Sequence, residues 1–218
     1  FTADNLLWFA ITRMDYFYSE PRLAMSYGGR LFVRFFAYGC VALLAAGGFV
    51  LAFSEIHSLK AVGFLIIIFF TDYLLHSNRS ERSLHSISSK YPNIAVYLSP
   101  KTYRALEFAL DRTAVENTDF TLNLFEELLK KSTAKKVIVG LNIKSYEFIA
   151  KLEARRRRSA NDDSKDETIS KINRLVLAGF TEAKQAGAEM VEPFHLFKAL
   201  LKSDEREVAK MFEIFGHK

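Results

Sequence analysis

Two stretches of the sequence share one pattern: Leu124-Phe125-Glu126-Glu127-Leu128-Leu129-Lys130 and Leu196-Phe197-Lys198-Ala199-Leu200-Leu201-Lys202, at an offset of 72. In both stretches the apolar residues recur at helical spacing, so each predicts one buried helix face. The same offset joins two further pairs, Phe108 with Phe180 and Arg112 with Lys184. Because repeated segments are copies of one supersecondary unit, we predict a duplicated helical domain.

The repeat extends outward from these helices. A polar break and another apolar helix follow each copy, at Val137–Ile143 and Val208–Phe215, with the register slipping by about one residue. We therefore predict a domain over 92–218, made of repeat one (98–154), a charged linker (155–167) and repeat two (168–218). Neither copy can bury its apolar face alone, so the expected fold is a pseudo-twofold bundle of roughly 120 residues.

Local signals agree with an all-α fold. Ser99 can cap a helix that begins at Pro100, and Gly187 is a plausible helix stop. One buried stripe recurs at spacings of three and four: Ile169, Ile172, Val176, Phe180 and Ala183. No stretch shows convincing strand alternation.

The linker between the repeats contains four consecutive arginines, Arg155–Arg158. They are interpreted as a solvated linker whose charge is offset by the nearby acids Asp162, Asp163, Asp166 and Glu167. Contact with lipid phosphates is the second interpretation. Nucleic acid is the third, because no aromatic platform accompanies the run.

The first third of the chain predicts a membrane hairpin over 31–76. Phe35–Phe53 contains no charge and is long enough to cross a bilayer, and Ala61–Leu75 is interrupted only by Asp72. Ser54–Lys60 is too short for more than a tight connection. A buried hairpin in a soluble protein fits less well, because soluble core helices rarely run so long without a polar face. A cleaved signal peptide fits less well because the first apolar run begins more than 30 residues into the sequence and lacks a small-residue cleavage pattern.

Basic residues flank the predicted hairpin, whereas its loop holds only Lys60, balanced by Glu55. The flanking residues are Arg13, Arg22, Arg30, Arg34, Arg79, Arg82 and Lys90. The positive-inside rule then places both ends in the cytoplasm and the loop outside. We expect a multi-pass protein of the inner (cytoplasmic) membrane, with the helical domain in the cytoplasm.

Two flanking segments complete this organisation. Residues 1–30 are aromatic and weakly charged, as in an interfacial amphipathic segment, or they are the end of an earlier span. Residues 77–91 are rich in Ser and charge, and predict a linker. Because Phe1 is not a methionine, a longer polypeptide is expected.

Composition and spacing give no catalytic signature. The net charge of +5 is modest, and the single Cys40 fits a reducing compartment. No phosphate-loop motif occurs, so this region is not expected to be an ATPase. The histidines lack metal-ligand spacing, and we expect no metal or cofactor.

The stretch Ala178-Gly179-Phe180-Thr181-Glu182-Ala183, continued by Val191–Leu201 and Val208–Gly216, resembles the second repeat of a Clp N-terminal domain. The segment Leu98–Ala154 is similar to the first repeat. The resemblance implies an eight-helix domain that captures protein substrates or adaptors for an AAA+ unfoldase, in cis or in trans, and for a Clp-type protease. ATPase modules are then expected further along the chain.

The resemblance also directs attention to the start of the second helix of each repeat. In the branch of the family that binds phosphorylated arginine, a Glu precedes the His of each repeat. Here Leu122 and Phe194 take that place, and Asn123 replaces one His. Because an apolar residue cannot hold a guanidinium, either these positions form apolar surface for client segments or they pack in the core. The candidate substrate- or adaptor-binding residues are Leu122, Phe194, Phe120 and Glu192.

Two other functions stay open. One is a stand-alone membrane adaptor or scaffold without ATPase modules. The other is a small transport or sensor component in which Asp72 carries the chemistry, since an intramembrane carboxylate is by default a functional hypothesis. No nucleic-acid partner is expected.

Overall fold

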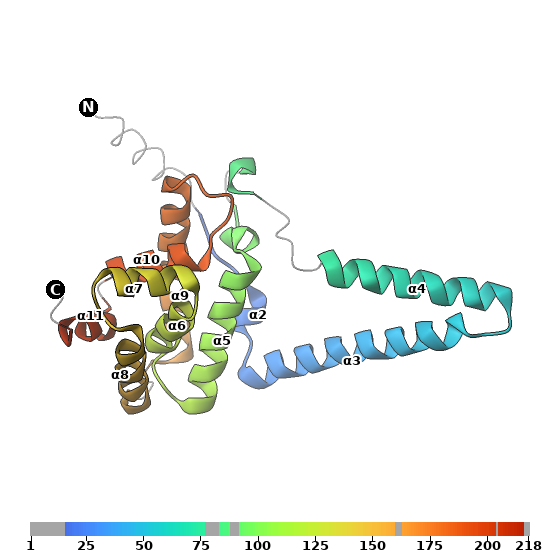
Figure 1. Cartoon of the computed structure of the whole chain (residues 1–218), viewed down its shortest axis with the longest axis horizontal. Coiled ribbons are helices and arrows are strands. Elements are labelled where there is room, and N and C mark those ends of the chain that lie inside the picture. The colour runs from blue at the N-terminus through green and yellow to red at the C-terminus, as the bar shows by residue number, and fades with distance from the viewer. Residues whose placement is uncertain (1–15, 77–82, 88–91, 160–162, 204, 216–218) are drawn as a thin grey trace. The chain divides into compact units, whose positions relative to one another are not determined.

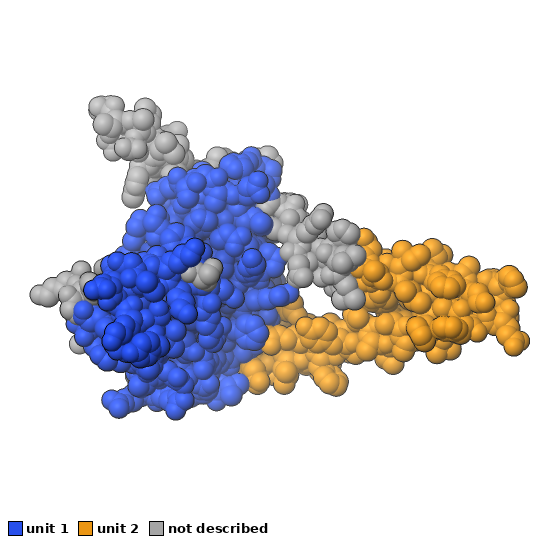
Figure 2. Space-filling view, viewed as in Figure 1, with its two compact units in different colours: residues 1–21, 80–218 blue, residues 22–79 orange. Residues whose placement is uncertain are grey.

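The computed structural model describes residues 16–76, 83–87, 92–159, 163–203 and 205–215. This described part is all-helical, with ten α-helices, two short 3₁₀ helices and no strand beyond two isolated β-bridges. The predicted all-α class is therefore confirmed for these residues. The chain divides into two compact units, one of residues 1–21 and 80–218 and one of residues 22–79 (Figure 2).

The smaller unit contains a hairpin of two long helices, α3 (Tyr27–Ala52) and α4 (His57–His76), after the short helix α2 (Pro21–Ala24) (Figure 1). The two long helices meet at glycines. A Cβ on Gly63 would lie 2.3 Å from the Ala52 nitrogen, and one on Gly48 would lie 2.6 Å from Cγ2 of Ile66. The backbones thus approach closely where no side chain stands between them, as small residues allow in membrane helix pairs.

Most apolar side chains of this hairpin face outward. Phe35 is 79% exposed and Leu43 is 75% exposed, and the same holds along α4 for Leu65 and Phe69. Among the described residues, one helix is long and apolar enough to cross a membrane by length and composition alone, namely α3. The side chains at the end of α4 lie outside the described residues, so the second span stays a prediction.

The larger unit contains the two predicted repeats. Repeat one has the helices α5 (Pro100–Glu116), α6 (Phe120–Leu129), α7 (Ser132–Gly140) and α8 (Ser145–Arg158). Repeat two has α9 (Lys165–Gln185), α10 (Pro193–Lys202) and α11 (Arg206–Glu213). The described residues of the bundle therefore hold seven α-helices, where the sequence resemblance implies eight.

The predicted helix ends are confirmed by their hydrogen bonds. The Ser99 side chain accepts a bond from the Thr102 amide at 3.2 Å, with Pro100 in the first turn of α5. At the other predicted end, Gly187 has a φ of 64°. The amides of Gly187 and Ala188 donate back to the carbonyls of Lys184 and Ala183, which is a Schellman closure of α9.

The two repeats pack around α6 and α10, which contact each other at the centre of the bundle. Phe125 and Phe197 hold equivalent places in the duplicated pattern, and their rings stack with centroids 5.7 Å apart. The repeats are also joined by backbone hydrogen bonds: Val191, before α10, pairs with Tyr97 and Ser99, before α5.

The predicted offset of 72 holds for α6 and α10 but is wrong for the first helices. Buried positions of α9 match those of α5 at an offset of 70, so that Phe180 corresponds to Leu110 rather than to Phe108. Phe180 is 1% exposed and Leu110 is 8% exposed, whereas Phe108 is 57% exposed. Two extra residues between the first and second helix of repeat two account for the change.

Segments on both sides of the hairpin pack on the larger unit. Tyr16–Glu20 pairs with Asn93 in a parallel bridge, and the 3₁₀ helix Ile94–Tyr97 (η2) follows it. Within the predicted linker, the 3₁₀ helix Leu84–Ser86 (η1) is bound through the Leu84 amide to the Glu189 carbonyl at 2.7 Å. The end of the predicted interfacial segment and part of the predicted linker thus belong to the helical domain, while residues 1–15 lie outside the described residues.

Candidate functional site

The four predicted binding residues differ in accessibility. Leu122 and Phe120 are 0% and 1% exposed, because α6 is the central helix and packs against α5, α7, α8, α10 and α11. Phe194 is half-buried, with its ring 6.4 Å from that of Phe197. Glu192, also half-buried, accepts a hydrogen bond from Ser99 Oγ at 3.1 Å. Leu122 therefore has no surface to offer a client, and Glu192 lies at the junction of α10 with the start of α5.

The position occupied by Asn123 and His195 is structural in both repeats. The Asn123 amide is fully buried and donates to Thr113 Oγ1 at 2.9 Å and to Thr118 Oγ1 at 3.0 Å, which ties α6 to α5. In repeat two, His195 Nδ1 accepts the Glu192 amide at 3.0 Å and so closes the first turn of α10. Burial lowers the pKa of His195, which keeps the acceptor nitrogen unprotonated.

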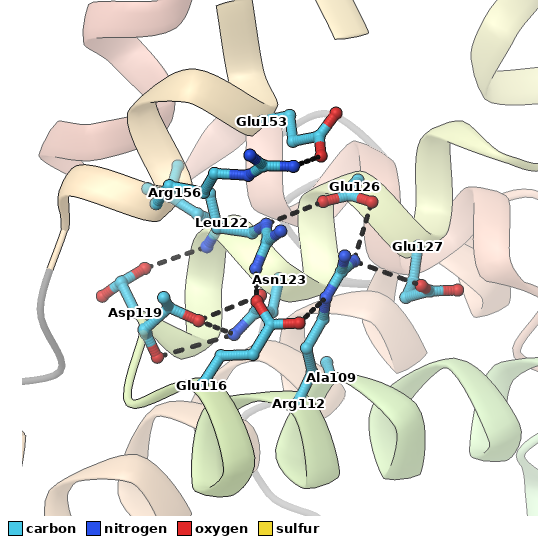
Figure 3. A network of polar contacts seen from close by, with 12 residues as sticks. Ala109, Arg112, Glu116, Asp119, Leu122, Asn123, Glu126, Glu127, Glu153 and Arg156 are labelled. Carbon is cyan, nitrogen blue, oxygen red and sulfur yellow. Dashed lines mark hydrogen bonds and ion pairs between the residues drawn. The ribbon is translucent and has the colours of Figure 1, made fainter. Parts of the chain in front are cut away.

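An ion-pair network with buried Arg156 and Glu126 at its centre joins three helices of repeat one (Figure 3). Arg156 of α8 is 2% exposed and bridges Glu116 of α5 and Glu126 of α6, the latter at 3.0 Å. Arg112 of α5 binds the same two carboxylates at 3.1 and 2.7 Å. The Arg156 guanidinium holds the pKa of Glu116 below its usual value. Because each charge has a partner, the network tolerates burial and fixes the packing of α8.

This network corrects the interpretation of the arginine run as a solvated linker. Arg155–Arg158 form the last turn of α8, where cations are favourable at the C-terminal end of a helix. Three of the four pair with carboxylates: Arg155 with Glu207, Arg156 with Glu116 and Glu126, and Arg157 with Glu153. Contact with lipid phosphates would compete with these pairs.

The first and second helices of repeat two, α9 and α10, are joined by a similar ion pair with the charges reversed. We call this line of contact between the two helices the seam. At the position equivalent to Arg112 stands Glu182, and at the position equivalent to Glu126 stands Lys198. Glu182 binds Lys198 at 2.9 Å and Lys202 at 2.5 Å. Burial alone would raise the pKa of Glu182, but the two ammonium groups outweigh it and the pKa is lowered. An opposite-charge pair at this site is thus common to both repeats, whichever helix carries the cation.

A cleft of about 390 Å³ opens beside this seam, between α9, α10 and the start of α6. Its floor is apolar and includes Phe120, Leu175, Ala178, Ala199 and Leu200. Its rim is charged and includes Lys171, Arg174, Glu182, Lys202 and Glu205. Of the four predicted binding residues, Phe120 lines this cleft.

The rim of this cleft, which we call the α9–α10 cleft, is mixed in charge but has exposed cations. Glu182 is already neutralised by two lysines, and Lys171 binds Asp163 at 2.6 Å. Arg174 is exposed and forms no ion pair with another residue in the described part of the chain. An apolar floor with polar groups at its edge is the usual composition of a ligand-binding cleft.

Sequence reasoning missed most of this cleft. Arg174, Ala178 and Ala199 lie on polar or small positions of otherwise ordinary helices, and only the crossing of α9 with α10 and α6 brings them together. A helical-wheel comparison of α9 could have shown that Lys171, Arg174, Ala178 and Glu182 share one face. In the described residues no group of three or more His, Cys, Asp or Glu side chains is placed to hold a metal ion.

No protein-family model, curated protein or solved structure matches this chain. The resemblance to Clp N-terminal domains therefore rests on the sequence pattern.

Proposed function

We propose that this chain is a membrane-anchored, non-catalytic protein-binding region that captures protein substrates or adaptors for a Clp-type unfoldase. The observation that carries the proposal is the contrast between the two units. One unit is a hairpin with outward-facing apolar side chains, and the other is a packed, duplicated helical domain with an open apolar cleft. The first has the chemistry of an anchor and the second that of a receptor.

The anchoring half of the proposal follows from the apolar surface that the hairpin exposes, which is more stable in lipid than in water. An exposed apolar surface of a few hundred Å² already marks an interaction or membrane surface. Here phenylalanines and leucines are exposed around α3 and along α4. Water would penalise each of these side chains by about 1.5–3 kcal/mol relative to an apolar environment. With basic residues at its ends, the hairpin is then oriented with both termini in the cytoplasm.

The binding half of the proposal concerns unfolded or extended segments. The α9–α10 cleft has room for one or two apolar side chains, and its rim can bind neighbouring acidic or polar groups. Burial of one large apolar side chain contributes about 1.5–3 kcal/mol, so a single cleft supports only weak capture. Weak, broadly selective capture suits a receptor that passes segments on to an AAA+ ATPase, in cis or in trans, and to a Clp-type protease.

The test is a substitution that fills the cleft with a large side chain and leaves the core residues unchanged. In Ala178→Trp, an indole occupies the α9–α10 cleft, because Ala178 is exposed and lines it. The matched control is Ala114→Trp on α5, which is also an exposed alanine within a helix but lines none of the described clefts. The full chain in lipid nanodiscs is titrated with an unfolded, reduced and alkylated model protein.

The proposal expects the wild type and Ala114→Trp to bind equally and Ala178→Trp to lose at least about tenfold in affinity, a loss of about 1.4 kcal/mol. Equal binding by all three proteins would rule out the cleft as the capture site. Absence of binding by the wild type would rule out the receptor function itself.

A further inference from the structure

The segment immediately before the hairpin is bound to the helical domain like an extended peptide ligand. Along Tyr16–Glu20, which we call the strap, half-buried and exposed residues alternate strictly. Tyr16, Tyr18 and Glu20 face inward, while Phe17 is 47% exposed. This period of two is typical of a strand on a surface, although the larger elements of the described chain are helices.

Backbone and side-chain bonds align the strap along Asn93. The Ile94 amide donates to the Phe17 carbonyl at 2.9 Å, in a parallel bridge. The Asn93 side chain bonds both polar backbone atoms of Ser19, accepting from its amide at 3.1 Å and donating to its carbonyl at 2.8 Å. The Asn93 side chain therefore makes the two backbone hydrogen bonds that a neighbouring strand would otherwise make with Ser19.

Aromatic contacts and one hydrogen bond hold the Tyr16 side chain on the helical domain. The Tyr16 ring lies 4.8 Å from the Phe180 ring, and its hydroxyl accepts a hydrogen bond from Lys184 Nζ at 2.9 Å. Tyr97 also lies near Phe180, with 6.5 Å between the ring centroids. Both the ring and the hydroxyl of Tyr16 therefore contribute to its binding on the helical domain.

The environment of Tyr18 differs from that of Tyr16. Its hydroxyl is buried and has no hydrogen-bond partner in the described part of the chain. Burial raises the pKa of Tyr18, and the nearby Glu20 and Tyr103 add to this effect. Because an unpaired buried hydroxyl is unfavourable, phenylalanine would fit this position better than the tyrosine that occupies it.

We propose that the surface formed by Asn93, Tyr97, Phe180 and Lys184, the strap site, is a second docking site for extended client segments with aromatic side chains two residues apart. The strap occupies this site in cis and is an intramolecular competitor. The imperfect fit of Tyr18 leaves room for a client with phenylalanine there to displace it. The strap site lies on the face of α9 opposite the α9–α10 cleft, since Phe180 and Ala178 are two residues apart on a helix.

The experiment uses the full chain in nanodiscs and a labelled peptide with the sequence of residues 14–22, together with its Tyr18→Phe form. The strap is weakened in the chain by Tyr16→Ala, which removes the ring and the hydroxyl that contact Phe180 and Lys184. A competing segment lowers the apparent affinity by the fraction of time for which the site is free. We expect the peptide to bind Tyr16→Ala at least about tenfold more tightly than the wild type, and the phenylalanine peptide to bind more tightly than the tyrosine peptide.

A second readout needs no substitution. The Ile94 amide is bonded to the strap, whereas the Leu124 amide is within the buried helix α6. If the strap opens on its own, Ile94 exchanges its hydrogen by local opening, at least about 100-fold faster than Leu124. The cleft variant Ala178→Trp is expected to bind the peptide like the wild type, so failure of the capture cleft and failure of the strap site are distinguishable.

Three results would overturn the proposal. A folded Tyr16→Ala variant that binds no peptide would show that the strap site accepts no ligand in trans. Exchange of Ile94 as slow as that of Leu124 would show that the strap does not open apart from the fold. Loss of cooperative unfolding in Tyr16→Ala would show that the strap is an integral part of the domain.

Discussion

The rings of Phe125 and Phe197 stack with centroids 5.7 Å apart and planes 4° from parallel. The two residues hold equivalent positions in the duplicated pattern, so each phenylalanine stacks on its counterpart from the other repeat. Phe148 and Phe212 lie within 6.0 Å of the Phe125 ring and extend the contact to α8 and α11. The centre of the domain is thus an aromatic cluster shared by both repeats.

Truncation of either ring is expected to destabilise the whole domain. Phe125→Ala and Phe197→Ala should each lower the free energy of unfolding by about 3–5 kcal/mol, because each leaves a cavity in a fully buried site. The double variant should cost less than the sum, by about 0.5–1.5 kcal/mol for a lost ring pair. Urea unfolding of the full chain in detergent micelles measures all three, and strict additivity would contradict direct coupling of the rings.

The arginine run offers a matched pair of substitutions. Arg156→Gln removes one of the two guanidinium partners of buried Glu126, which keeps Arg112 at 2.7 Å, and is expected to cost about 1.5–3 kcal/mol. Arg157→Gln, one residue along, removes only an exposed pair with Glu153 and should change stability by less than about 1 kcal/mol. Equal effects on the thermal midpoint would mean that the run acts only through its total charge.

The reversed seam of repeat two predicts a rescue. Glu182→Lys should destabilise the domain, because Lys198 and Lys202 would then face a third cation. Adding Lys198→Glu recreates the arrangement found in repeat one, with the cation on the first helix. We expect the double variant to recover at least half of the loss in melting temperature, whereas Lys198→Glu alone should give no gain.

Acidification should weaken the domain through His195 and Glu182. The pKa of His195 is lowered by burial, so the unfolded chain binds a proton that the folded chain excludes, and stability falls as pH drops below the ordinary value of about 6.5. The lowered pKa of Glu182 removes further stability as pH falls below about 4.3, its ordinary value. His195→Asn, with the residue of repeat one, should remove the first loss and keep the second in melting curves measured from pH 7 to about pH 3.

The hairpin can be tested with the single cysteine of the chain. Cys40 lies within α3, and in intact membranes it should resist a membrane-impermeant maleimide. In a Cys40→Ser background, Ser54→Cys at the hairpin loop should label from outside and Ser86→Cys only after the membrane is opened. Labelling of Cys40 in sealed vesicles would argue against a span, and the reverse pattern for the other two would invert the orientation.

Much of the fold was predictable because it depends on short-range patterns. The duplicated sequence located α6 and α10, and Ser99 and Gly187 marked helix ends. Those signals act within one turn of a helix, so they can be recognised without tertiary information.

The features that were missed depend on contacts between distant segments. Arg156 cannot be distinguished from its neighbours until α8 packs against α5 and α6. Phe108 seemed to match Phe180 because the offset came from α6 and α10, and two extra residues before α10 change it. The sequence left open whether Leu122 binds clients or packs in the core, because its burial depends on the central position of α6.

The double hydrogen bond between Ser19 and Asn93 has a practical consequence for protein engineering. The bond joins a segment that precedes residues 22–79 to one that follows them, so the helical domain is built from both sides of the hairpin in sequence. A water-soluble receptor should therefore be made by excising residues 22–79 and joining residues 21 and 80 with a flexible glycine-serine linker. Cutting the chain after the hairpin instead would discard Tyr16 and Tyr18 and leave Phe180 bare, so such a fragment would display a surface that the intact protein keeps covered.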